Sequence, residues 1–426
     1  MMLSDTLHAS AAAAEAFPIG QVRAQFPALG VGDRIYLDGP GGTQMCAPAM
    51  TAMLRHLETG TANLGGAFST SVETGALSDA AHAAIADLLG AAPEDIAFGP
   101  NMTTLTLSVS RALAREWREG DEIVVTRLDH DANVAPWLLA AEDRGATVRW
   151  LDFDPDSGVL RLDTLPALLG PRTRLVAVGG ASNAIGTLND VAMIAELVKA
   201  HSDAILFVDA VQSVPHVATD VAALGCDLLV CSPYKFFGPH QGVLWGRAEL
   251  LEKIRAYKVR PAADRPPARA FETGTPSFEA QAAVIGTIDY FDRLGAHFAP
   301  GAGTRVERLR SAFQAFQAYE VLLSKRLLDG LHAIPSVKLW GPPTTSGRVP
   351  TFGLTLANCR PDRAAEALAR RDIFAWSGHF YAVEVVARLG LSESGGLLRL
   401  GLCHYNTAGE VDRTLNALED IAAHAL

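Results

Sequence analysis

The chain has 426 residues, of which 49% are hydrophobic and 19% are charged. These values are typical of a folded globular protein, and the length predicts two domains. The formal net charge of −11 argues against nucleic acid as a main partner, and no apolar run approaches the roughly 20 residues of a membrane-spanning helix, so no membrane partner is expected.

Residues 1–17 read MMLSDTLHASAAAAEAF. They have no basic start, and Glu15 breaks their small apolar run, so we expect no signal peptide and a cytoplasmic location. The cysteines are scattered and form no C-x-x-C pair, which predicts small buried side chains with neither a disulfide framework nor a metal site. They are Cys46, Cys226, Cys231, Cys359 and Cys403.

One short strand and two helices are expected before the main run of strands. An apolar strand at Arg34–Leu37 leads into a Gly-rich loop, and Thr51–Glu58 and Ser78–Leu89 have the apolar spacing of amphipathic helices. The Gly-rich loop by itself predicts only a turn.

A strand at Ile96–Phe98 then runs through a tight turn into a helix that continues to Leu113. The start of such a helix offers free backbone N–H groups and the positive end of its dipole, which together bind phosphate. Its polar residues are also good helix caps, so the pattern alone leaves both roles open. The residues concerned are Asn101, Thr103 and Thr104.

Three further strands, at Ile123–Thr126, Val148–Phe153 and Leu175–Val178, alternate with helical segments and predict an α/β large domain. His130 follows the first of them, and Asn183 follows the third. A His after a strand is usually a cap or a surface residue, and an Asn in a Gly-rich turn has an adequate structural role. Position alone therefore does not give either residue a function.

Two apolar runs, Ile205–Val208 and Leu228–Cys231, predict neighbouring parallel strands that are buried on both faces. Asp209 ends the first and Lys235 follows the second, so both should reach the edge of the sheet where open α/β sheets bind ligands. Taken alone, the two could form a plain ion pair. A lysine with a lowered pKa can also form a Schiff base, and a carboxylate can hold a pyridine nitrogen, which is the pair that pyridoxal 5′-phosphate requires.

The last part of the chain predicts a long joining helix at Arg305–Leu331 and then a small α+β domain. We therefore divide the chain into an N-terminal segment (1–30), a large domain (31–295) and a small domain (296–426). The elements expected in the small domain are strands at Thr351–Leu356 and Leu397–Cys403 and helices at Pro361–Arg371 and Glu410–Ala423, with Thr407 and Glu410 in capping-box spacing.

The strings VDAVQSVPH and DLLVCSPYKFFGP closely resemble the class V aminotransferase and cysteine desulfurase family of fold-type I pyridoxal-phosphate enzymes. The resemblance implies a large domain built on a mostly parallel seven-stranded sheet. It also implies that Asp209 pairs with the pyridine nitrogen, that Gln212 hydrogen-bonds the ring hydroxyl and that Lys235 carries the cofactor. Ser232 and Tyr234 are implied to contact the cofactor as well, Tyr234 in place of a His that contacts its phosphate.

Other motifs extend this resemblance from about Arg34 to the C-terminus. YLD followed by a Gly-rich loop resembles the entry to the family's active site, which implies that this segment lines the substrate side. GPNMTT implies that Met102 and Thr103 form much of the phosphate cup. DHDANVAPW implies that His130 stacks on the cofactor ring and passes protons, and SNAIGT implies that Asn183 lies near the ring hydroxyl and the substrate.

Two motifs carry implications for the partner and the substrate. FETGTP resembles a segment whose Thr reaches the cofactor phosphate of the partner subunit, so Thr275 implies a homodimer with shared sites. LLRLGLCHYNT implies that Arg399 clamps the substrate carboxylate, which suits its fork of donors. A solvent-facing arginine on a strand is the alternative.

One loop departs from the family pattern. The desulfurase branch carries R-x-G-H-H-C, whose Cys accepts sulfur as a persulfide, whereas this chain reads WSGHFY, with Trp376 in the Arg position and Tyr381 in the Cys position. A phenol cannot replace the thiolate in that step, so persulfide-type desulfuration is not expected. His379 and Tyr381 are expected beside the substrate.

These observations predict a pyridoxal-phosphate enzyme that acts on a small L-amino acid through an external aldimine, with Lys235 moving the Cα proton. Desulfurase-like or C–S lyase chemistry ranks first, and amino transfer or epimerisation ranks second. A non-enzymatic α/β binding protein is the third interpretation, and the absence of a P-loop or a strand-linked G-x-G-x-x-G weakens it.

Overall fold

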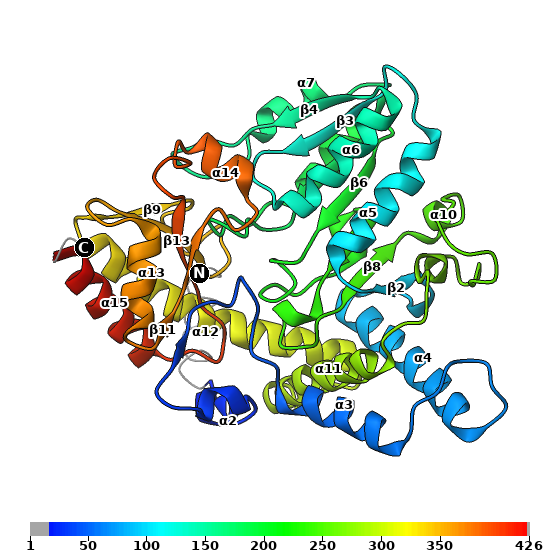
Figure 1. Cartoon of the computed structure of the whole chain (residues 1–426), viewed down its shortest axis with the longest axis horizontal. Coiled ribbons are helices and arrows are strands. Elements are labelled where there is room, and N and C mark those ends of the chain that lie inside the picture. The colour runs from blue at the N-terminus through cyan, green and yellow to red at the C-terminus, as the bar shows by residue number, and fades with distance from the viewer. Residues whose placement is uncertain (1–16, 424–426) are drawn as a thin grey trace.

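A seven-stranded sheet forms the centre of the larger part of the molecule (Figure 1). The computed structural model describes residues 17–423. The expected absence of a signal peptide concerns residues 1–17, which lie almost wholly outside this range. The strand order is β2-β8-β7-β6-β5-β3-β4. The strands are β2 (Ile96–Gly99), β3 (Glu122–Thr126), β4 (Thr147–Leu151), β5 (Thr173–Gly179), β6 (Ile205–Asp209), β7 (Leu228–Cys231) and β8 (Gly242–Gly246).

The predicted mostly parallel α/β sheet is confirmed. Neighbours from β4 to β7 pair in parallel, and β8 runs antiparallel to both β7 and β2. In the pair β6 and β7, Asp209 stands opposite Val230, so both strands end at the same edge of the sheet. This register places the chain after each strand at one rim, as parallel pairing requires.

Alternate residues of the central strands face two different cores, because side chains in a strand point to opposite faces. Phe207 of β6 packs in the core that includes Leu105 and Trp137, whereas its neighbours Leu206 and Val208 pack in the core that includes Ile194. The first core lies under α5 (Met102–Leu113) and α6 (Ala135–Arg144), and the second under α4 (Ser69–Leu89), α8 (Val191–His201) and α11 (Phe278–Phe298).

Two helices begin earlier than the sequence predicted. Helix α3 runs over Ala47–Thr59 rather than from Thr51, with Pro48 in its first turn, where a missing N–H costs nothing. Helix α4 begins at Ser69 rather than Ser78. Its first turns are rich in Ser and Thr, which hides the start, and Thr74 bonds its hydroxyl back to the carbonyl of Thr70.

The C-terminal part of the chain contains a four-stranded antiparallel sheet in the order β12-β13-β10-β9. A separate parallel pair joins β1 to β11, so the strand near Tyr36 contributes to this part although it lies close to the amino terminus. The elements are β1 (Ile35–Tyr36), β9 (Val337–Trp340), β10 (Thr351–Leu356), β11 (Ile373–Phe374), β12 (Trp376–Gly378), β13 (Leu397–Gly401), α13 (Pro361–Ala369), α14 (Val383–Arg388) and α15 (Ala408–Ala423).

The long helix α12 (Arg305–Ala333) joins the two parts, as predicted (Figure 1). A capping box between Thr304 and Glu307 fixes its start. Phe313 in its first half packs in the core that it shares with α11, and Leu327 in its second half packs in the core of the C-terminal part. The remaining helices are α2 (Ile19–Arg23), α7 (Leu165–Leu168), α9 (Val221–Leu224) and α10 (Ala248–Leu251).

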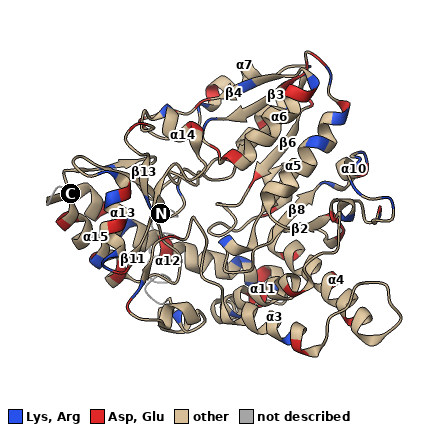
Figure 2. Ribbon diagram, in the orientation of Figure 1, with Lys and Arg blue, Asp and Glu red and all other residues tan. Residues whose placement is uncertain are grey.

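Charged side chains of both signs are interspersed along the described elements (Figure 2). No helix within residues 17–423 is long and apolar enough to cross a bilayer. Within the same residues, no group of His, Cys, Asp and Glu side chains is arranged to hold a metal ion.

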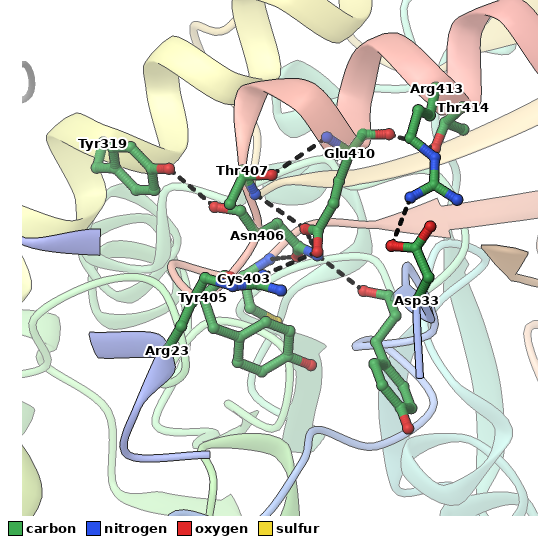
Figure 3. A network of polar contacts seen from close by, with 11 residues as sticks. Arg23, Asp33, Tyr319, Cys403, Tyr405, Asn406, Thr407, Glu410, Arg413 and Thr414 are labelled. Carbon is green, nitrogen blue, oxygen red and sulfur yellow. Dashed lines mark hydrogen bonds and ion pairs between the residues drawn. The ribbon is translucent and has the colours of Figure 1, made fainter. Parts of the chain in front are cut away.

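A polar network ties the start of α15 to the amino-terminal segment (Figure 3). Thr407 N–H donates to Glu410 (2.9 Å) and Glu410 N–H donates to the Thr407 hydroxyl (3.2 Å), so the predicted capping box is confirmed. Asn406 donates to the carbonyl of Tyr36 (3.1 Å), and Arg23 forms an ion pair with Glu410 (2.8 Å). The network joins strand β1 to the end of the strand that carries the predicted carboxylate clamp.

Replacing Thr407 with Ala removes the acceptor for the N–H of Glu410 and should lower the free energy of unfolding by about 1 kcal/mol. Thermal unfolding followed by far-ultraviolet circular dichroism measures this loss. Thr407→Ser keeps the hydroxyl and should unfold close to the wild-type temperature. Equal losses in both variants would contradict the capping role.

Candidate active site

A cavity of about 290 Å³ lies where the parallel strands β5, β6 and β7 end. It receives side chains from the large sheet, from the start of α5, from the Gly-rich loop 38–42 and from β12 and β13 of the C-terminal part. A hollow of about 960 Å³ lies elsewhere, but the smaller cavity holds three buried charged side chains. The predicted site residues that line it are Met102, Thr103, His130, Asn183, Asp209, Gln212, Ser232, Tyr234, Lys235, Tyr381 and Arg399.

Lys235 is held at the cavity by a short turn, Pro233–Lys235, that follows β7. Its side chain is buried, and its Nζ donates to the carbonyl oxygens of Pro40 (2.6 Å) and Gly41 (3.0 Å). Burial, and then the charge of Arg399, lower the pKa of this amine to about 7. A large fraction of the amine is therefore uncharged at neutral pH, which is the state that attacks a carbonyl.

Asp209 is the last residue of β6 and is buried. Its Oδ1 accepts a hydrogen bond from the N–H of Val211 (3.0 Å). Burial raises the pKa of the carboxyl to about 6, and the nearby charge of Lys235 lowers it. Because no ion pair to Asp209 forms within residues 17–423, this buried carboxylate is suited to receive a cationic group of a ligand.

Arg399 lies in the middle of β13 and is 4% exposed, so it does not face solvent. Its Nη1 donates to the carbonyl of Asn183 (2.9 Å), and its Cζ lies 4.1 Å from the centroid of the Phe380 ring. Its Nε is buried and has no hydrogen-bond partner among residues 17–423. Burial lowers the pKa of the guanidinium to about 9. A buried guanidinium with an unused donor fits a ligand carboxylate.

His130 combines a capping role with a place in the cavity. Its Nδ1 accepts the N–H of Ala132 (3.0 Å), and its ring stacks on Tyr381 at 5.4 Å between centroids. Burial, followed by the charges of Lys235 and Arg399, lowers the pKa of the imidazole to about 4. The ring is therefore neutral at pH 7, and because Nδ1 accepts, its proton is on Nε2.

The start of α5 provides backbone donors at one end of the cavity. Asn101 accepts the N–H of Thr104 (2.8 Å), which confirms its capping role. The N–H groups of Met102 and Thr103 belong to the first turn of the helix, and no residue of the helix lies four positions before them to accept a hydrogen bond. They are therefore left without an intrahelical partner. The buried hydroxyl of Ser232, another residue of the cavity wall, has no partner in the described structure. These groups form a site suited to phosphate.

Asn183, Gln212 and Tyr234 connect the walls of the cavity. Asn183 donates through Nδ2 to the carbonyl of Phe380 (2.8 Å), and its Oδ1 is buried without a partner among the described residues. Gln212 donates to the carbonyl of Pro40 (2.9 Å). The ring of Tyr234 lies 4.6 Å from Nζ of Lys235. All three residues therefore touch segments that close the cavity.

The loop that follows β12 covers the cavity from the side of the C-terminal part. Trp376, Phe380 and Tyr381 line the cavity. His379 does not: its side chain is exposed, and its Nδ1 accepts the N–H of Tyr381 (3.0 Å). The predicted substrate contact at His379 is therefore absent from the cavity wall, because the imidazole supports the loop instead.

Thr275 lies away from this cavity. It is exposed and lines the larger hollow together with Glu272, whose carboxylate bonds His82 (2.7 Å) and the N–H of Phe98 (2.9 Å). The loop that bears Thr275 is thereby tied to strand β2 and helix α4. A role for Thr275 within its own chain's cavity is not supported by this position.

All five cysteines are buried and free, as the sequence predicted. None of them lines the cavity. Burial raises the pKa of the Cys359 and Cys403 thiols, the two cysteines of the C-terminal part, so neither is set up as a thiolate.

Asp38 is the site residue that the sequence analysis missed. It ends the YLD segment, and its Oδ1 is buried without a hydrogen-bond partner in the described structure. Burial raises the pKa of this carboxyl to about 6, whereas the charges of Arg399 and Lys235 lower it. The resemblance of YLD and the following Gly-rich loop to the family's active-site entry placed this segment at the site, but it gave Asp38 itself no role.

Comparison with known proteins identifies the family. A family model described as aminotransferase class-V matches residues 35–414. The chain belongs to the class-V aminotransferase family. It is 32% identical to the aminotransferase-like protein FGM3 of Gibberella zeae, over 95% of this chain and 98% of that protein. It is 31% identical to a cysteine desulfurase of Dickeya dadantii, over 96% and 97% of the two chains.

A solved structure supports the same assignment. The apo structure of a cysteine desulfurase from Thermococcus onnurineus NA1 matches with a TM-score of 0.86 at 26% identity, over 96% of this chain and 98% of that chain. The chain is therefore a pyridoxal-phosphate-dependent enzyme, which removes the interpretation as a non-enzymatic binding protein.

The residues of the cavity fit this cofactor. Lys235 offers an amine whose pKa of about 7 leaves a substantial uncharged fraction near neutral pH, and Asp209 offers a buried carboxylate without an ion pair in the described part of the chain. The unpartnered hydroxyl of Ser232 and the free N–H groups at the start of α5 suit its phosphate. The predicted individual contacts with the cofactor stay predictions.

The charges around Lys235 predict opposite effects of two substitutions. Arg399→Gln removes a like charge and should raise the pKa of Lys235 above 7, whereas Asp209→Asn removes an opposite charge and should lower it. Competitive acetylation of the cofactor-free protein over a pH series, with mass spectrometry of the Lys235 peptide, measures the pKa. Shifts in the same direction for both variants would contradict this electrostatic arrangement.

Proposed function

We propose that this enzyme is a C–S lyase that acts on a small L-amino acid with a sulfur substituent on Cβ. In the reaction, the Cα–H and Cβ–S bonds break, and the sulfur leaves with the electron pair and takes a proton. After addition of water, the carbons leave as pyruvate and the amino nitrogen leaves as ammonia. No oxidant or amino acceptor is required. The single observation that favours this chemistry is the absence of any thiol from the cavity wall.

The missing thiol bears directly on the fate of sulfur. Tyr381 stands where the desulfurase branch carries its cysteine, and the chain's own cysteines are buried. A phenol oxygen cannot take up sulfur as a persulfide, because that step needs a thiolate. Release of the sulfur compound into solution is the outcome that these residues support.

Bound pyridoxal phosphate supplies an aldehyde that condenses with amines and a ring that withdraws electrons from Cα. Lys235 would hold this group and move the Cα proton. Its pKa of about 7 suits both roles, since a base works best with a pKa near the working pH. Asp209 would keep the ring nitrogen protonated from its buried position at the end of β6.

Arg399 and His130 would orient the substrate. The unused Nε of Arg399 and the burial of its guanidinium favour a bond to the substrate carboxylate. Neutral His130 presents a flat ring with its proton on Nε2, which suits stacking and proton donation. Phe380 and Tyr381 line the cavity on the side of the C-terminal part.

Product analysis tests the lyase proposal. Purified protein incubated with L-cysteine and S-methyl-L-cysteine, without a keto acid, should release equal amounts of pyruvate and ammonia with the corresponding thiol. Lys235→Ala should abolish release. Alanine as the product would indicate desulfurase chemistry. Turnover only with an added keto acid would indicate amino transfer, and a change of configuration at Cα alone would indicate epimerisation. Each of these three results would refute the lyase proposal.

We further propose a homodimer in which Thr275 serves the cavity of the partner subunit. Thr275 is exposed and remote from its own cavity, and the Glu272 contacts hold its loop in place. Both features are consistent with a contact made across a two-fold interface.

Mixed dimers test this arrangement. Lys235→Ala and Thr275→Val chains should each be impaired alone, but after mixing, each heterodimer has one cavity with both native residues. If the subunits redistribute at random, about a quarter of the cavities should be native, so activity should recover toward that level. No recovery, despite heterodimers seen by native mass spectrometry, would place Thr275 in its own subunit's site.

A further inference from the structure

The mouth of the cavity is formed by aromatic side chains that remain accessible. Trp376 and Tyr381 line the cavity and are nevertheless 54% and 65% exposed. Large aromatic side chains are mostly covered in a folded chain. Two accessible rings at the rim of a reactive cavity indicate a ligand group that covers them.

The backbone under these rings is strained. Phe380 and Tyr381 have φ of 53° and 59°, in the left-handed region that non-glycine residues rarely adopt. Asn183 holds the carbonyl of Phe380 (2.8 Å), and the N–H of Asp131 holds that of Tyr381 (2.7 Å). Such strain persists where surrounding bonds fix it, and it is concentrated at ligand sites.

Trp376 lies beside the proposed carboxylate clamp. It stands opposite Arg399 in the antiparallel pair of β12 and β13, so the two side chains project from the same face of the sheet. Its indole packs closely against Gly41, where a Cβ would lie 2.5 Å from the indole nitrogen. A substrate held by Arg399 therefore has the indole as its immediate neighbour.

The cavity leaves little room for a large leaving group inside. Its volume of about 290 Å³ is at the low end for ligand sites, which span about 300–1,000 Å³, and it must hold the cofactor and the amino-acid backbone. Its charged side chains are Asp209, Lys235 and Arg399, all buried. The side chains of Trp376, Phe380 and Tyr381 on the cavity wall are aromatic and uncharged, so a sulfur substituent that extends toward them meets aromatic rings.

We propose that the natural substrates carry an aryl or heteroaryl group on the sulfur, placed between Trp376 and Tyr381. This inference rests on the proposed C–S lyase function and names the substrate class of that site. Aromatic groups stack favourably on such rings, whereas a small thiol or a carboxylate gains nothing from them.

Three L-cysteine thioethers test the inference: S-phenyl, S-methyl and S-carboxymethyl. With the pyridoxal-phosphate-loaded enzyme, kcat/KM for the S-phenyl compound should exceed that for the S-methyl compound by about tenfold. The anionic S-carboxymethyl compound should show no gain over the S-methyl compound. Calorimetric binding to cofactor-loaded Lys235→Ala should show the same order without turnover. Equal or reversed preferences in binding would overturn the inference.

Variants at the mouth separate stacking from other effects. Tyr381→Ala and Trp376→Ala should reduce the S-phenyl to S-methyl ratio toward one, whereas Tyr381→Phe, which keeps the ring, should retain it. A ratio unaffected by both alanine variants would overturn the inference. Pyruvate release without any aryl preference would refute the substrate class alone, and aryl-selective binding without pyruvate from any thioether would refute the lyase function alone.

Discussion

The burial of an amine, a carboxylate and a guanidinium around one small cavity is the constraint on which the site depends. Each charge is costly to bury alone, and each changes the pKa of its neighbours. Asp209 and Lys235 come from adjacent parallel strands, whereas Arg399 comes from the C-terminal sheet. The two parts of the molecule must therefore be held together for the cavity to exist, and α12 and the pair β1 and β11 join them.

The proposed lyase chemistry depends on the loop over the mouth of the cavity. Where those enzymes are expected to place a sulfur acceptor, this chain presents Tyr381, stacked on His130. The side-chain amide of Asn183 and the N–H of Asp131 donate to the backbone carbonyls of Phe380 and Tyr381 and hold the loop in place. In the proposed function, the buried residues of the cavity act at Cα, and the residues of this loop determine the fate of sulfur and the size of the leaving group.

Much of the sheet and the centre of the site followed from the sequence, because buried parallel strands are continuous apolar runs whose polar ends share an edge. That rule predicted that Asp209 and Lys235 lie close together. It gave Asp38 no role, although the resemblance placed its loop at the site, because the bonds from Lys235 to the carbonyls of Pro40 and Gly41 join segments that are distant in the chain. It also could not show that His379 turns outward, because this depends on the left-handed backbone at Phe380. Helix α4 began earlier than predicted because serine and threonine mask its first turns.

The central claim is that the buried amine of Lys235 carries pyridoxal phosphate. Borohydride reduction of the cofactor-loaded protein, followed by peptide mass spectrometry, tests it directly, because reduction makes the linkage to the amine permanent. We expect a phosphopyridoxyl group on Nζ of Lys235. A label on another lysine, or no covalent label on a protein that holds the cofactor, would contradict it.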